Sequence, residues 1–125
     1  MPVIEVRTNL KKEEIPAGFL KRLSDKGVEL TKTQESLMVA QLDSDRVMSF
    51  AGTEEPCAVV TLRCIGVIKD PEQIHVIADE VNKFISKELG IKPERFYTLY
   101  NELAADDVAY TGLTVPELKK KLGLA

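Results

Sequence analysis

The chain has few of the residues from which common catalytic sites are built. Its 125 residues include one histidine, two cysteines and no tryptophan. A zinc site needs several cysteine or histidine ligands, and the chain has neither a CxxC pair nor a second histidine. Ser/His/Asp catalysis would have to use His75, which falls within an expected helix. The sequence therefore favours neither of these sites, and we expect no metal and no cofactor.

Long apolar runs are also missing. The longest apolar stretches are far shorter than the ~20 residues of a membrane-spanning helix. Glu5 and Arg7 interrupt the apolar N-terminus, which argues against a secretory signal. We expect a cytoplasmic protein without membrane insertion, although secretion by a non-classical route would leave no trace in the sequence. The net charge of −3 and the pI of about 5.3 argue against a nucleic-acid partner.

The two cysteines, Cys57 and Cys64, are seven residues apart. If both lie on one strand, the odd spacing puts them on opposite faces. We therefore expect buried, reduced thiols rather than a disulfide.

The chain consists of two copies of one pattern, strand–helix–strand. The first copy has an expected strand over 3–8, a helix over 16–30 and a strand over 38–42. The second has a strand over 57–65, a helix that starts at the capping Asp70 with Pro71 and stops at Gly90, and a strand over 96–102. Two βαβ units predict an α/β (α+β) fold with a four-stranded mixed sheet and two helices on one face.

The strands over 38–42 and 57–65 carry apolar residues on both faces. Two helices can cover only one face of the sheet, so the other face needs a second cover. Another copy of the chain is the simplest candidate, which predicts a homo-oligomer.

The length favours a single domain over 1–125, in which 113–125 is a C-terminal extension. Residues 104–110 predict a turn and a short edge strand. Thr114 to Glu117 resembles a capping box, which opens a short helix through Leu122. Lys119 to Lys121 is interpreted either as a solvated charge run at a helix C-terminus or as a contact for an acidic partner.

Pro2 directly precedes the first strand. If Met1 is removed, Pro2 carries a free secondary amine at a fixed place. An α-amino group titrates near ~7.7–8.0, and burial beside another cation lowers that pKa. Such an amine is a candidate general base near neutral pH, although proline at position two is common and alone predicts nothing.

Several segments resemble the family of macrophage migration inhibitory factor and D-dopachrome tautomerase, within the tautomerase superfamily. They include Pro2 at a strand start and a set of short motifs in order from residue 2 to about Tyr110: 8–10, 16–20, 48–58, 64–66 and 93–97. The resemblance implies a homotrimer and enol–keto tautomerase activity on aromatic 2-oxo acids (phenylpyruvate-like) or dopachrome-like compounds. It implies Pro2 as the catalytic base, Ile65 and Val108 as pocket walls, and Tyr97 as an aromatic residue lent by the neighbouring subunit.

Four positions depart from the family pattern. The family's carboxylate-binding lysine aligns with Thr33, so Lys32, one residue earlier, is the candidate for that role, with a solvated loop lysine as the alternative. Leu99 replaces a pocket asparagine, the family's CxxC reads Cys57 to Val60, and Tyr110 replaces a tryptophan. Leu99 and Thr33 keep open a second hypothesis, a secreted cytokine-like protein with a vestigial pocket and a cell-surface receptor as partner. A scaffold trimer with neither role is the third.

Overall fold

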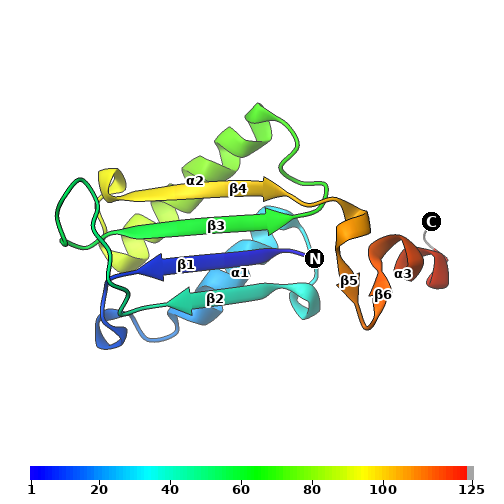
Figure 1. Ribbon diagram of the computed structural model, residues 1–125, viewed down its shortest axis with the longest axis horizontal. Coiled ribbons are helices and arrows are strands. Elements are labelled where there is room, and N and C mark those ends of the chain that lie inside the picture. Colours follow the sequence, from blue (N-terminus) through cyan, green and yellow to red (C-terminus); the bar gives the residue numbers. More distant parts are fainter. Residues whose placement is uncertain (124–125) are drawn as a thin grey trace.

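The computed structural model describes residues 1–123 and has two layers, a four-stranded sheet and two helices on one of its faces (Figure 1). The strand order is β2-β1-β3-β4, with β1 at Val3–Thr8, β2 at Val39–Asp43, β3 at Ala58–Cys64 and β4 at Phe96–Glu102. Strands β1 and β2 are parallel, β3 and β4 are parallel, and the central strands β1 and β3 are antiparallel. The predicted pair of βαβ units and the mixed sheet are confirmed.

The two large helices differ in how well their starts could be predicted. Helix α2 (Pro71–Leu89) has the expected bounds, because the Asp70 Oδ1 accepts a 3.0 Å hydrogen bond from the Gln73 N–H and Gly90 ends the helix with a φ of 67°. Helix α1 (Phe19–Thr31) begins three residues later than the expected start at residue 16. The cause is Gly18, whose φ of 78° is left-handed and interrupts the helical backbone.

The core lies between the sheet and the helices. It combines the helix-facing residues of the central strands with one stripe from each helix: Ile4, Val6, Val60, Leu62, Phe19, Leu23, Ile77, Val81 and Ile85. Burying each of these aliphatic or aromatic side chains contributes roughly 1.5–3 kcal/mol before entropy costs. These stripes at helical spacing hold α1 and α2 on the sheet.

The opposite face of the sheet is uncovered in the single chain. Val39, Tyr97 and Leu99 on the two edge strands are 48%, 64% and 49% exposed. The face is less apolar than the pattern predicted, because Glu5 and Thr61 of the central strands share it. A covering subunit for this face stays a prediction.

The C-terminal residues form a separate small unit beside the N-terminal end of β1 (Figure 1). A 3-10 turn, η4 (Ala105–Asp107), leads into a hairpin of β5 (Ala109–Tyr110) and β6 (Leu113–Thr114), followed by α3 (Val115–Lys121). The expected short strand is present as β5, which pairs with β6 and not with the main sheet. The reason is the two-residue turn, in which Thr111 and Gly112 have φ values of 54° and 82°, the backbone of a tight hairpin.

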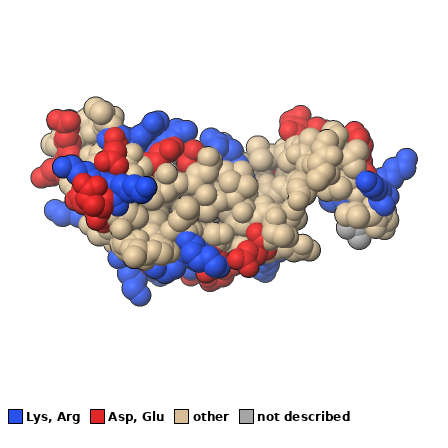
Figure 2. Space-filling model, turned by 90° about the horizontal axis from the view of Figure 1, so that it is seen from below, with Lys and Arg blue, Asp and Glu red and all other residues tan. Residues whose placement is uncertain are grey.

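Further 3-10 turns precede α1, β2 and β4: η1 (Lys12–Glu14), η2 (Glu35–Leu37) and η3 (Pro93–Arg95). Charges of both signs are interspersed over the main body, with an uncharged stretch where it meets the C-terminal unit (Figure 2). No helix within residues 1–123 is long and apolar enough to cross a membrane.

Candidate active site

Pro2 is held at the end of the sheet by both neighbouring strands. Val3 pairs with Arg63 of β3, so the antiparallel register places Pro2 opposite Cys64. On the other side, the Pro2 carbonyl accepts a 3.2 Å hydrogen bond from the Val39 N–H. The proline ring is fully buried. Its position is therefore defined by sheet pairing.

A cavity of about 500 Å³ adjoins this end of the sheet. Met1 lines it together with residues from four other places in the chain: Leu37, Ile65, Tyr110, Leu118 and Lys119. The size is within the range of small-molecule sites, and the lining is mostly apolar with few polar groups, as such sites usually are. Ile65, for which the family resemblance implies the role of a pocket wall, lines this cavity.

The charge state of the groups around Met1 reflects their burial. Burial lowers the pKa of the Met1 ammonium below its ordinary value, and the nearby Cys64 thiolate opposes this in part. Burial, and then the carboxylate of Glu102, raises the pKa of the Cys64 thiol. Both effects favour the neutral form of the group concerned.

The loop that carries Ile65 is tied to β4 by Glu102. Its Oε2 accepts a 2.6 Å hydrogen bond from the Gly66 N–H, and its Oε1 accepts one of 3.4 Å from the Ile68 N–H. The Leu103 N–H adds a 2.8 Å bond to the Cys64 carbonyl. Sequence reasoning missed Glu102, because a single glutamate at a strand end carries no signal of which loop it will meet.

Lys32 is the C-cap residue of helix α1. Its φ is 55°, in the left-handed region, and its N–H donates a 2.8 Å hydrogen bond to the Val28 carbonyl. Its side chain lines a second cavity of about 500 Å³, together with Gly66 and with Glu72 from the start of α2. Lys32 and Ile65 therefore line different cavities, and among the described residues Lys32 does not line the cavity at Met1.

Val108 contributes to this region through its backbone carbonyl. Its carbonyl accepts a 2.9 Å hydrogen bond from the Val115 N–H, which fixes the start of α3 beside η4. The side chain is half-buried and is not among those lining the cavity at Met1. Tyr110, in the hairpin, does line it.

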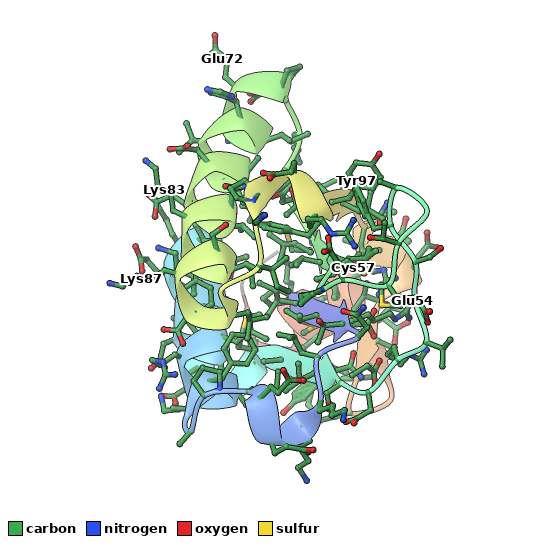
Figure 3. All side chains as sticks on the ribbon, turned by 90° about the vertical axis from the view of Figure 1, so that its left-hand side faces the viewer. Glu54, Cys57, Glu72, Lys83, Lys87 and Tyr97 are labelled. Atoms are coloured by element: carbon green, nitrogen blue, oxygen red, sulfur yellow. The ribbon has the colours of Figure 1, made fainter. Side chains whose placement is uncertain are left out.

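Tyr97 lies at the opposite end of the sheet. It pairs with Val59, near the start of β3, and its ring is 5.2 Å from that of Phe50 between centroids. Figure 3 looks onto this end, where Tyr97 and Cys57 are found beside the loop that carries Glu54. Tyr97 and Glu102 are five positions apart along β4, which is about 17 Å at ~3.3 Å per residue. Tyr97 is therefore too far from Pro2 of the same chain to contact it.

The loop beside Tyr97 is held by a buried arginine that sequence reasoning also missed. Arg95 donates hydrogen bonds to the carbonyls of Phe50 (2.7 Å), Glu55 (2.8 Å) and Pro56 (3.2 Å). Its guanidinium also lies 5.4 Å from the centre of the Phe50 ring. Arg95 therefore positions Phe50, and through it the ring of Tyr97.

Comparison with known proteins decides the family. The family model described as macrophage migration inhibitory factor (MIF) matches residues 1–116. The chain belongs to this family. The family is part of the tautomerase superfamily, so the resemblance inferred from the sequence motifs is confirmed.

Individual relatives agree with the family model. The chain is 30% identical to macrophage migration inhibitory factor of Rattus norvegicus over 114 residues, which covers 91% of this chain and 98% of the relative. It is also 30% identical to the MIF-like protein mif-2 of Caenorhabditis elegans over 122 residues, which covers 97% and 100%. The solved structure of macrophage migration inhibitory factor from Trichinella spiralis superposes with a TM-score of 0.86 at 28% identity, over 90% of this chain and 98% of that one.

The family model covers only the start of helix α3. It ends at residue 116, whereas α3 continues through Lys121. Leu118 and Lys119, which line the cavity at Met1, therefore lie beyond the matched region.

Proposed function

We propose that this protein is a cofactor-independent keto–enol tautomerase of aromatic 2-oxo acids, phenylpyruvate-like compounds, or of dopachrome-like compounds. Pro2 is the general base. The observation that supports this most is a fully buried Pro2 next to Met1, which lines a mostly apolar cavity, in a chain of the tautomerase superfamily. We place the protein in the cytoplasm, with secretion by a non-classical route as an addition.

Removal of Met1 is the step that creates the base. While Met1 is attached, the Pro2 nitrogen is part of an amide and has no basic lone pair. Once Met1 is cleaved off, the Pro2 nitrogen becomes a secondary amine next to the cavity that Met1 lines in the uncleaved chain. Burial lowers the pKa of the Met1 ammonium, and it acts in the same direction on a Pro2 ammonium held deeper in the fold.

The reaction moves one proton. The unprotonated Pro2 nitrogen takes the proton from the enol hydroxyl, and the C–O bond becomes the carbonyl of the ketone. The electron pair of the C=C bond then takes the proton back from the prolinium, at the carbon next to the one that carries the oxygen. A positioned base of this kind contributes roughly 10²–10⁴ in rate. The apolar walls exclude water, which strengthens the electrostatic interactions within the cavity.

The other site residues are proposed on weaker grounds. Ile65 forms a wall, and Val108 contributes a second apolar position next to it. Lys32, which the sequence suggests for holding the substrate carboxylate, lines the other cavity and is not placed in this site. In a homotrimer, Tyr97 of one subunit completes the site of its neighbour. The exposed outer ring of Tyr97, and its distance along β4 from its own Pro2, support this arrangement.

The test is an ultraviolet assay of hydroxyphenylpyruvate ketonisation with the parent protein and Pro2→Gly. Glycine at position two also permits removal of Met1, so both proteins present a free amine, and intact mass confirms the processing. We expect Pro2→Gly to lose roughly 100-fold or more of kcat/KM. Equal rates in the two proteins would remove Pro2 from the mechanism.

A cytokine-like signalling role is the second candidate. Thr33 stands where the family has its carboxylate-binding lysine, and Leu99, 49% exposed on the outer face, stands where it has an asparagine. Both changes reduce polar contacts to a substrate. The role predicts that protein whose Pro2 amine is chemically blocked still binds a cell-surface receptor. Loss of that binding on blocking would instead tie signalling to the pocket.

A further inference from the structure

Helix α3 presents one lysine on an otherwise apolar face. Val115, Leu118, Lys119 and Leu122 are spaced i, i+3, i+4 and i+7, which places them on one side of a helix. All four line the cavity at Met1, whereas Lys120 and Lys121 do not. The three consecutive lysines therefore lie on different sides of the helix, and only Lys119 is on the side that faces the cavity.

The helix is fixed in this orientation by local contacts. The Thr114 Oγ1 accepts a hydrogen bond of 3.4 Å from the Glu117 N–H at its start. Val115 is buried, 5% exposed, and its N–H is bonded to the carbonyl of Val108. These contacts determine which face of α3 meets the cavity, and Lys119 is part of that face.

The charges around the two candidate lysines differ. Within residues 1–123, Lys119 is the one side chain with a formal charge among those lining the cavity at Met1, and no carboxylate lines it. Lys32 shares its cavity with Glu72, whose negative charge opposes the binding of an anion there. A single cation in an apolar cavity favours a ligand with an apolar body and one negative group.

We propose that Lys119 of α3 binds the carboxylate of the substrate, in the role for which the sequence suggested Lys32. The ligand class is an aromatic carboxylic acid whose ring lies against the apolar residues of the cavity. This assignment builds on the proposed tautomerase function, and it makes α3, which the family model covers only through residue 116, part of the substrate site.

The test measures binding without turnover. The probes are 3-phenylpropanoate and its primary amide, 3-phenylpropanamide, which share one shape and differ in charge. Calorimetric titration of the processed parent protein should show tighter binding of the acid than of the amide. Lys119→Met should weaken the acid roughly tenfold or more and leave the amide unchanged, because a charge-assisted hydrogen bond is lost. Lys119→Arg should retain most of the preference.

Two controls carry the same loss of charge. Lys120→Met removes a lysine from the next position of the same helix, so it matches any long-range electrostatic effect. Lys32→Met tests the competing assignment. We expect both to bind the acid as the parent does. If Lys119→Met binds the acid as tightly as Lys120→Met does, or if only Lys32→Met loses the preference, the assignment of Lys119 is overturned.

The ketonisation assay separates this inference from the proposed function. Pro2-dependent turnover together with acid binding that is indifferent to Lys119 would overturn the inference and leave the tautomerase proposal intact. Acid binding that depends on Lys119, in a protein without Pro2-dependent turnover, would support the site and refute the tautomerase.

Discussion

Replacing Arg95 by methionine should destabilise the protein, because that side chain holds the loop between β2 and β3 to the start of β4. Its guanidinium is bonded to four loop carbonyls, at 2.7, 2.8, 3.2 and 3.5 Å. The residue is only 9% exposed. Methionine fills much of the same volume but donates no hydrogen bond, so the four carbonyls lose their partner.

The magnitude follows from these contacts. Hydrogen bonds to a charged donor contribute about 1.5–3 kcal/mol each, but surface-loop carbonyls regain water, so we expect a total loss of about 2–4 kcal/mol. The unfolding entropy is about 2.1 cal/mol/K per residue, or about 0.26 kcal/mol/K for 125 residues. The melting temperature should therefore fall by about 8–15 °C.

The assay is thermal unfolding followed by circular dichroism at one fixed protein concentration. Arg46→Met is the matched control, since Arg46 is an exposed arginine of the same loop for whose side chain no hydrogen bond or ion pair is found within residues 1–123. Arg95→Lys keeps the charge but not the planar fork, so it should fall between the parent and Arg95→Met. A shift for Arg95→Met no larger than that for Arg46→Met would refute the role assigned to the guanidinium.

Two further predictions concern the helix cap and the shared site. Asp70→Ala should lower the free energy of unfolding by about 1 kcal/mol and the melting temperature by about 4 °C, because the hydrogen bond from the Gln73 N–H is lost. Asp79→Ala is the control, since Asp79 forms only an exposed ion pair on the same helix, and it should change the melting temperature little. Equal shifts in the two variants would contradict the capping account. Co-refolding Pro2→Gly with Tyr97→Ala subunits at equal amounts should restore about a quarter of the sites, because random neighbours then combine an intact Pro2 with an intact Tyr97. No recovery of ketonisation would contradict a site shared between subunits.

Local signals explain why most of the fold was predictable. Asp70, Pro71 and Gly90 each act on the backbone within a few residues, so α2 has the expected bounds. The start of α1 was placed at residue 16 because Pro16 is a common first helical residue, while the left-handed Gly18 two residues later was overlooked. The hairpin at Thr111 and Gly112 was equally local, and a two-residue turn containing glycine was its signal.

The site was less predictable, because it depends on contacts between distant segments. Arg95 and Glu102 act on loops 40 and 36 residues away along the chain, and no spacing in the sequence announces either contact. Lys119 is different. Its spacing from Val115 and Leu122 indicates a position on an apolar helical face, whereas the run of three lysines by itself indicates only a solvated, charged segment.

The most direct test of the central claim is a titration of the Pro2 nitrogen itself. Protein labelled with [¹⁵N]proline and lacking Met1 can be followed by nitrogen NMR across the neutral pH range, beside kcat/KM for ketonisation. We predict a Pro2 transition below the ordinary α-amino range of ~7.7–8.0, since burial disfavours the charged form. The rate should rise with pH through the same transition, because only the unprotonated amine accepts a proton. A Pro2 pKa at or above the ordinary range, or a rate that does not follow it, would contradict the account.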